Sequence, residues 1–416
     1  MRVLPTSIAM LLLLFSCSSW GQVEQETRSL NLSGFGTLGF VHSNNKEVDY
    51  VRDLLQVDGV GRTRKLDFGV DSLLGLQADY AIFDGLSATA QVVSRRAQSN
   101  FKPDLTWGFL RYAPNDTAQV RLGRLGFDVY LLADSRNVGS SYPWVRPPIE
   151  FFGSLIISHI DGGDVVLKQS FGNGVMQAKI YSGTAQEKAS TGGLQSEFFS
   201  LEGSPLVGGH VEYVDQHWHA RIGLAQLRFK NEFPQLNQLI SALQTPLLQN
   251  LDPNAASYAQ GVRFQDKRVR YLSSGLAYDR GPFKAQVMLS RMSSHTLGFP
   301  SNNAGFTTIS YRMGKWTPYV SYSKIKSIHT PPTLQLPLGL DPQLDALAKS
   351  FYQVTHAQLA DQQTQSLGLR FDLSESTDIK VQVDRIRSHQ GLLIRYDHPS
   401  WNGRGTLFSL ALNFVF

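Results

Sequence analysis

The last ten residues of the chain carry its clearest pattern of hydrophobic and polar positions. From Phe408 to Phe416 every second residue is large and apolar, whereas the residues between them are smaller or more polar on the whole. A period of two over this length predicts a β-strand with one strongly apolar face.

The same alternation recurs along the chain and predicts sixteen strands. Their ranges are 30–42, 66–82, 86–96, 105–113, 117–124, 160–171, 175–183, 205–215, 218–230, 268–280, 283–293, 305–314, 317–327, 364–373, 378–388 and 404–416.

Short and long connections alternate between these strands. Every second junction is a cluster of turn-forming residues that reverses the chain within a few positions, as in Phe83-Asp84-Gly85 and Gly172-Asn173-Gly174. The intervening junctions are mostly long: 43–65, 125–159, 184–204, 231–267, 328–363 and 389–403, with shorter ones at 97–104 and 294–304. Such sorting indicates a barrel with one rim of tight periplasmic turns and one rim of extracellular loops.

Polar residues occupy the second face of many strands. Lys380, Gln382 and Asp384 alternate with apolar neighbours, for example. A sheet that spans a membrane must close, because lipid offers no partner for backbone groups. Sixteen strands leave a lumen too wide for side chains to fill. The predicted class is therefore all-β: a transmembrane antiparallel β-barrel of about sixteen strands, with apolar residues toward lipid and polar residues around an aqueous channel.

Composition narrows the picture further. The 416 residues are 42% hydrophobic and 18% charged, and no long apolar run follows the first twenty residues. These values exclude a charge-rich disordered chain and a helical membrane protein. The net charge of +5 is too small and too scattered for a nucleic-acid partner.

The N-terminus predicts export. Arg2, a short apolar stretch and small residues up to Gly21 form a secretory signal, so we expect a signal peptide at 1–21 and one barrel domain at 22–416. The single cysteine, Cys17, lies within the signal. Leu14-Phe15-Ser16-Cys17 loosely resembles a lipoprotein cleavage box, although the bulky Phe15 fits it poorly, so lipidation of Cys17 stays open.

Three short motifs carry a resemblance to a known family. Residues 33–39 form a glycine-rich amphipathic opening strand, Leu122-Gly123-Arg124 precedes the third long loop, and Phe416 is a terminal aromatic residue. In these features and in its strand count the mature chain resembles the general porins of Gram-negative outer membranes. The resemblance implies an outer-membrane homotrimer, a third loop folded inward and passive diffusion of small hydrophilic solutes. It also implies that Phe416 is a sorting signal for the barrel assembly machinery.

If that resemblance holds, the loop 125–159 forms the pore constriction. Acidic loop residues facing basic wall residues would create a transverse field that sorts solutes. An alternative, compatible with the first, is that these charges only pin the loop. The candidate constriction residues are Arg95, Arg111, Arg121, Arg124, Asp128, Asp134 and Glu150, of which Arg124 turns inward only if a bulge intervenes.

Further charged positions are expected to line the lumen wall. They are Asp79, Arg221, Lys284, Arg370, Lys380 and Asp384, four basic and two acidic residues, which predicts a slight preference for anions.

Two long loops carry a helical period. Apolar residues recur at i, i+3 and i+4 within 235–248 and within 342–359, after Pro331-Pro332. Each segment predicts an amphipathic helix, which packs as a lid on the outer rim or enters the mouth and narrows it.

Motifs for chemistry are weak. Gly34-x-Gly36-x-x-Gly39 has the spelling of a dinucleotide fingerprint, but the strand pattern continues and no helix follows. His217 and His219 flank a tryptophan expected in an aromatic girdle, and two ligands alone are a weak metal signal. We therefore expect no cofactor, no metal and no enzyme. The expected function is a porin for small hydrophilic solutes, and the alternatives are a substrate-specific channel narrowed by loop helices or, less favoured, an outer-membrane enzyme.

Overall fold

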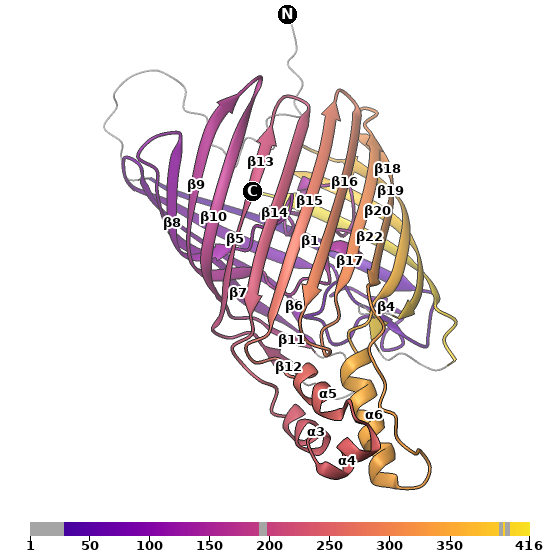
Figure 1. Ribbon diagram of the computed structural model, residues 1–416. Helices are drawn as coiled ribbons and strands as arrows, with labels where there is room; N and C mark the ends of the chain where they lie inside the picture. Colours follow the sequence, from indigo (N-terminus) through magenta and orange to yellow (C-terminus); the bar gives the residue numbers. More distant parts are fainter. Residues whose placement is uncertain (1–28, 191–197, 391–393, 396–399) are drawn as a thin grey trace, which may run out of the picture.

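The computed structural model describes residues 29–190, 198–390, 394–395 and 400–416. The expected signal peptide and Cys17 lie outside these residues. Sixteen long strands form one antiparallel sheet (Figure 1). They are β1 (Leu30–Ser43), β5 (Leu73–Phe83), β6 (Leu86–Ala97), β7 (Asn100–Tyr112), β8 (Ala118–Gly126), β9 (His159–Phe171), β10 (Gly174–Ala185), β13 (Ser204–Val214), β14 (Trp218–Arg228), β15 (Arg268–Arg280), β16 (Phe283–Ser294), β17 (Asn302–Tyr311), β18 (Trp316–Ser327), β19 (Asp361–Asp372), β20 (Thr377–Gln390) and β22 (Arg404–Val415).

The sheet closes on itself. Each long strand pairs with the next one along the chain, and β22 pairs with β1 in a register that runs from Phe35–Val415 to Ser43–Leu407. The last residue also takes part, since the backbone groups of Gly34 and Phe416 exchange two hydrogen bonds of 2.8 and 3.0 Å. The barrel therefore has no free edge, and the predicted sixteen-stranded class is confirmed.

The seam between the first and last strands depends on glycine. A Cβ atom at Gly34 or Gly36 would lie 2.3 Å from the ring of Phe416 or Phe414. The glycine-rich opening strand thus provides room for the aromatic residues of the last strand. No nucleotide-binding turn forms there, since β1 continues as a strand to Ser43.

Strand boundaries agree with the sequence pattern, with two differences. The strand expected at 66–82 begins at Leu73, because Leu66–Asp67 forms a separate short strand, β4, that pairs with β1. The junction expected at 97–104 is only two residues long, because β7 already begins at Asn100. Tight turns form the rim opposite the long loops. Four glycines in these turns, Gly85, Gly172, Gly281 and Gly314, adopt positive φ angles.

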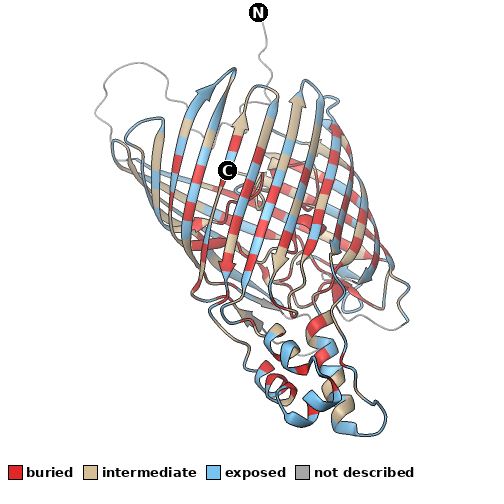
Figure 2. Cartoon of the chain, in the orientation of Figure 1, coloured by how far each residue is buried: buried red, intermediate tan, exposed pale blue. Residues whose placement is uncertain are grey.

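Apolar side chains cover the outer surface of the barrel. Along each strand exposed and buried residues alternate (Figure 2). Ile180, Leu122 and Leu367 are between 62% and 70% exposed, whereas their strand neighbours face the interior. An apolar outer surface is what a lipid-facing barrel requires.

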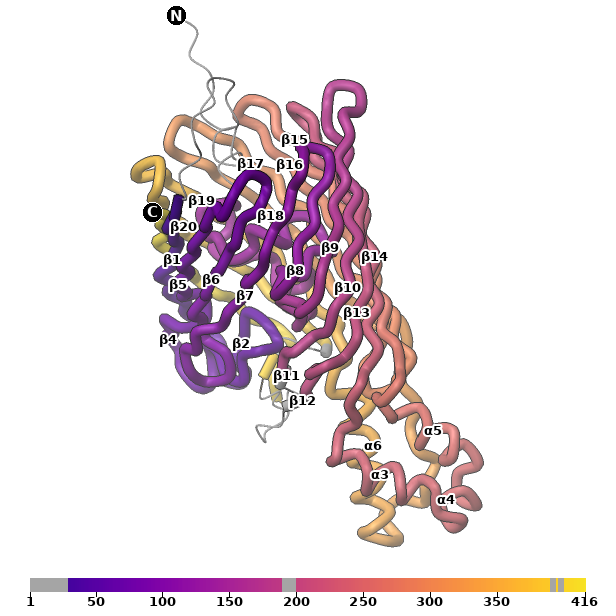
Figure 3. The backbone as a smooth tube through the Cα atoms, turned by 90° about the vertical axis from the view of Figure 1, so that its left-hand side faces the viewer, coloured from indigo at the N-terminus to yellow at the C-terminus, as the bar shows by residue number. Residues whose placement is uncertain are grey.

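Two long loops build a helical cap beyond the loop rim. The cap consists of α3 (Leu236–Leu243), α4 (Pro246–Leu251), α5 (Ala255–Gly261) and α6 (Pro342–His356). It projects from one side of the rim, away from the barrel interior (Figures 1 and 3). The helices contact one another, and the Phe351 ring, which is fully buried, lies 5.3 Å from that of Tyr258. Neither helical loop enters the mouth.

The first predicted helix is divided in two. Thr245 ends the apolar period and accepts a hydrogen bond from the Leu248 backbone as the N-cap of α4, with Pro246 at its first position. Leu247, expected on the apolar face, is consequently 66% exposed. No helix in the described ranges is both long and apolar enough to cross a membrane.

We predict that Phe351→Ala loosens the cap without affecting the barrel. Removing a fully buried aromatic side chain costs about 3–5 kcal/mol, and this loss falls on the contact between α6 and α5. Limited proteolysis should cut within 328–360 much faster than in the wild type, while heat resistance of the barrel on a gel stays unchanged. The matched control is Tyr352→Ala, since Tyr352 is half exposed on the other side of α6. Equal protection in both variants would contradict the observed packing.

Candidate functional site

The third long loop, residues 127–158 between β8 and β9, lies inside the barrel. It contains a short 3-10 helix, η1 (Gly139–Ser141), and one helical turn, α2 (Ile149–Phe152). The Trp144 indole donates a hydrogen bond of 2.9 Å to the Thr308 hydroxyl on β17, and the Val145 backbone donates one of 2.9 Å to the Gln382 side chain on β20. The loop therefore crosses the lumen and lies against the opposite wall.

Lys380 is the innermost anchor of this loop. Its ammonium group is fully buried and donates hydrogen bonds to the carbonyl oxygens of Gly139, Tyr142 and Trp144 at 2.5, 2.5 and 3.0 Å. A lysine has three donors, so this arrangement satisfies all of them. One side chain of β20 thereby fixes six residues of loop backbone.

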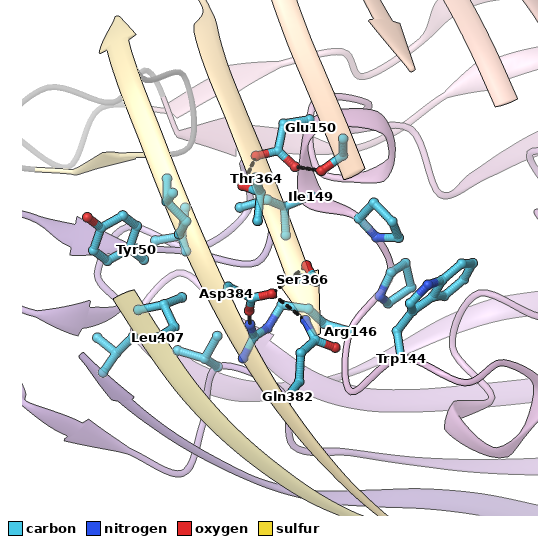
Figure 4. A pocket seen from close by; sticks show the side chains of 17 residues that line it. Tyr50, Trp144, Arg146, Ile149, Glu150, Thr364, Ser366, Gln382, Asp384 and Leu407 are labelled. Atoms are coloured by element: carbon cyan, nitrogen blue, oxygen red, sulfur yellow. Dashed lines mark hydrogen bonds and ion pairs between the residues drawn. The ribbon is translucent and has the colours of Figure 1, made fainter. Parts of the chain in front are cut away.

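Arg146 forms the second anchor. Its guanidinium binds Asp71 of the first loop through both Nε and a terminal nitrogen, and its other terminal nitrogen lies 2.7 Å from Asp384 on β20. The Ser409 hydroxyl accepts a further hydrogen bond of 2.6 Å. Figure 4 shows Arg146 between the loop and the wall, beside Gln382. Two carboxylates thus neutralise one buried guanidinium, as a buried charge requires.

Glu150 is the third anchor. It is fully buried, and its oxygens accept hydrogen bonds from Ser323, Gln362 and Thr364 on β18 and β19. Figure 4 shows Glu150 beside Thr364. Glu150, one of the candidate constriction residues, therefore does not face the open lumen. It serves the alternative role, in which loop charges hold the loop in place.

A row of alternating charges follows the wall from β8 to β14. Arg121 binds Asp164 at 2.6 Å. Lys179 lies between two carboxylates, 3.4 Å from Asp164 and 2.8 Å from Asp128. Arg221 pairs with both Asp128 and Glu212. Burial would raise the pKa of the Asp128 carboxyl, but the positive charges of Arg221 and Lys179 hold that pKa well below its usual range. Asp128 is therefore ionised and pins the start of the third loop.

Of the three acidic loop candidates, Asp134 alone is exposed, and it lies near enough to Arg121 and Lys179 for their charges to act on it. Asp128 and Glu150 are buried within the anchors.

Arg124 points to the outer face of the barrel and is not a constriction residue. It lies two residues from the exposed Leu122 on the outward phase of β8, and Leu125, on the inward phase, is buried among loop residues. The pairing with β9 continues without a shift, so no bulge turns Arg124 inward. It forms an ion pair with Asp161 at 2.6 Å on the outer face.

Arg95 and Arg111 do not share one constriction. Arg111 lies next to the turn that follows Tyr112, is exposed, and donates a hydrogen bond to Gln119. Arg95 lies near the loop end of β6, 3.5 Å from Asp53. Their strands place them near opposite rims.

The expected wall residues divide into two groups. Arg221, Lys380 and Asp384 are buried under the third loop, and Arg370 joins them through a 2.6 Å hydrogen bond to the Ser140 carbonyl. Asp79 and Lys284 lie on uncovered wall. Asp79 accepts a hydrogen bond of 2.6 Å from Thr89, and Lys284 pairs with Asp279 near a turn.

The first loop, residues 44–72, also packs against the barrel interior, although the strand pattern predicts only a long loop there. Its short strands β2 (Asp49–Tyr50) and β3 (Val60–Gly61) form a sheet with β21 (Ile394–Arg395) of the last loop. Val48, Tyr50 and Val60 are buried against β20 and β22. The apolar residues of this long loop were the sequence signal that could have indicated its inward packing.

Where the first and third loops meet the wall they enclose a small cavity, shown in Figure 4. Tyr50, Trp144 and Leu407 contribute to its largely apolar lining, and the ions beside it, Arg146 and Asp384, already have partners. In the part of the chain that the structure covers, no group of three or more metal-ligating side chains converges.

Comparison with known proteins gives structural matches alone: no family model and no curated protein sequence matches the chain. The fold is similar to OmpF of Salmonella typhi (11% identity, 95% of this chain and 99% of the other, TM-score 0.53). It is equally similar to the outer membrane channel DcaP of Acinetobacter baumannii (12% identity, 95% and 99%, TM-score 0.53). OmpT of Vibrio cholerae in its trimer form matches at 10% identity (94% and 100%, TM-score 0.51). The chain therefore has the fold of the outer-membrane porins.

We predict that Lys380→Met releases the third loop. The isosteric apolar side chain leaves three buried carbonyl groups without their donor, which costs about 3 kcal/mol or more. Protease should then cut within 127–158 in the folded barrel, and open-channel current noise should rise. Lys284→Met is the matched control, because Lys284 is about half exposed and its one ion pair among the described residues is with Asp279. If both variants behave as the wild type, Lys380 does not hold the loop.

Proposed function

We propose that the protein is an outer-membrane porin that lets small hydrophilic solutes and ions diffuse through a lumen narrowed by its first and third loops. The observation that carries the proposal is the inner wall left uncovered by the third loop. Arg111 faces inward and is nevertheless exposed to solvent, as an aqueous lumen requires. The closed sheet around the lumen pairs its own backbone groups and separates the lumen from the apolar outer surface.

The outer surface supports a membrane location. Exposed aromatic residues surround the turn rim, namely Tyr80, Phe83, Tyr112, Phe171, Trp218, Phe283, Tyr311, Trp316 and Phe416. Such a girdle marks a membrane–water interface. Trp218 belongs to it and packs against Tyr278 with a ring-centroid distance of 4.6 Å, whereas the His219 side chain is hydrogen-bonded to Glu212.

Further parts of the proposal are supported by the N-terminal sequence and by the porin-like fold. We infer a cleaved signal at 1–21, one barrel domain at 22–416, a homotrimer, and recognition of Phe416 by the barrel assembly machinery. Phe416 is 66% exposed and stacks beside Phe414 at the membrane edge, where an assembly factor could reach it. The role requires no cofactor and no catalysis.

A substrate-specific channel is the second candidate, favoured by the inward position of two loops. The helical cap does not narrow the pore in this case, because it lies outside the rim (Figure 3). The narrowing instead comes from the anchored third loop and from the first loop.

Planar-bilayer recording tests the proposal. The refolded protein is expected to give stable ohmic current steps, and a salt gradient is expected to give a reversal potential that favours anions slightly, since the uncovered lumen retains basic residues such as Arg111. The folded state is verified separately by its heat-dependent gel mobility. A correctly folded barrel without conductance would overturn the porin proposal, and a cation-selective reversal potential would overturn the anion preference.

A further inference from the structure

Most buried arginines of the lumen are tightly paired with carboxylates. Arg146 and Arg221 each bind two acidic side chains, and Arg121 binds Asp164 through two nitrogens. A buried guanidinium without such a partner is costly, because it has left water without gaining an ion pair. Any group of poorly paired arginines in this interior is therefore informative.

Three arginines of this kind line a second opening, between the first loop, the third loop and β6. They are Arg52, Arg95 and Arg136, and a single carboxylate, Asp53, lines the opening with them. The opening has about 470 Å³ of space, part of it open solvent. Its charged lining sums to three positive and one negative group.

Within the described residues these three guanidiniums are paired more loosely than Arg146 and Arg121 are. Arg95 lies 3.5 Å from Asp53, and Arg52 lies 3.8 Å from Asp71, a carboxylate that already binds Arg146. The Arg136 guanidinium donates a 2.6 Å hydrogen bond to the Tyr130 hydroxyl, and within the described ranges no carboxylate lies within 4.0 Å of it.

The surrounding chain holds these arginines in place. Arg52 and Arg95 expose only 14% and 18% of their side chains, and the Tyr142 hydroxyl donates a hydrogen bond to the Arg136 carbonyl. The Glu187 carboxylate, whose charge acts on Arg136, accepts hydrogen bonds from the Ser158 and His159 backbone groups and from the Ser158 hydroxyl. The positive charge is thus preorganised and only partly neutralised by the protein itself.

The remainder of the lining is mixed, with the polar residues Asn137 and Ser158 and one apolar side. Pro147, Phe152, Leu155 and Ile156 of the third loop form one side of the opening. Such surfaces bind hydrocarbon, whereas guanidinium groups bind carboxylates in bidentate geometry.

We propose that this opening binds a small organic carboxylate, with its charged group among Arg52, Arg95 and Arg136 and its apolar body against the third loop. The inference rests on the proposed function, because the ligand reaches the opening through the lumen. It adds to that function a saturable site for one class of solute near the loop rim.

Calorimetric titration of the folded barrel in detergent tests the proposal with benzoate as the probe. Benzamide removes the charge and acetate removes the apolar body, so both are expected to bind at least about tenfold more weakly. Inorganic phosphate is the arm that tests a purely electrostatic site. Phosphate or acetate binding as tightly as benzoate would overturn the proposal, and so would the absence of benzoate binding.

Two variants locate the site. Arg136→Gln and Arg95→Gln are each expected to weaken benzoate binding about tenfold or more, whereas Arg111→Gln, a lumen arginine outside the opening, should bind as the wild type does. An equal loss in all three variants would assign binding to general lumen charge and overturn the proposal. Heat-dependent gel mobility shows which variants fold, and the comparison of benzoate with benzamide on the wild type needs no variant.

Calorimetry does not depend on conductance, so the two proposals fail in distinguishable ways. A conducting barrel that does not bind benzoate leaves the porin function and removes the site. A barrel that binds benzoate without conducting keeps the site and removes free diffusion.

Discussion

The structure depends on one constraint: the sheet must leave no backbone group unpaired. The chain meets this constraint by joining β22 to β1 and by carrying the pairing to its last residue, Phe416. Gly34 and Gly36 make the seam possible, since larger residues would collide with Phe416 and Phe414. Closure then sets the other properties, because a closed sheet of sixteen strands has an interior that its own side chains cannot fill.

The loops make use of that interior. The third loop crosses it and is held by Lys380, Arg146 and Glu150, each of which satisfies several buried polar groups. These anchors join the loop to β18, β19 and β20, and Asp128 joins its start to β10 and β14. The loop is therefore a fixed part of the lumen wall. Arg52, Arg95 and Arg136 are not among these anchors, and they line the opening between the first loop, the third loop and β6.

Much of the fold could be predicted from the sequence, because strand alternation and turn residues are local signals. All sixteen long strands, the sorting of turns and loops, and both helical segments have such signals. The break between α3 and α4 also has a local signal, because Thr245 is a capping residue and is followed by Pro246. The inward packing of the first loop was harder, since Tyr50 is buried by residues more than three hundred positions away in the sequence.

The candidate site was less predictable, for a physical reason. Alternation shows which face of a strand a charge occupies, and it would have placed Arg124 outward with Leu122. It does not show which charges lie opposite one another. Arg146 meets Asp71 and Asp384 across 75 and 238 residues of sequence, so whether an ion pins a loop or faces water is decided by closure and loop path.

The central claim is that the conducting path runs along the inward third loop. The most direct test places single cysteines in a chain without Cys17, at the exposed positions Asp134 in the third loop and Lys349 in the helical cap. A bulky charged thiol reagent is then added during single-channel recording. We predict a stepwise fall in current for Asp134→Cys and an unchanged current for Lys349→Cys, with both sites labelled. Labelling of Asp134→Cys without any change in current would contradict the account.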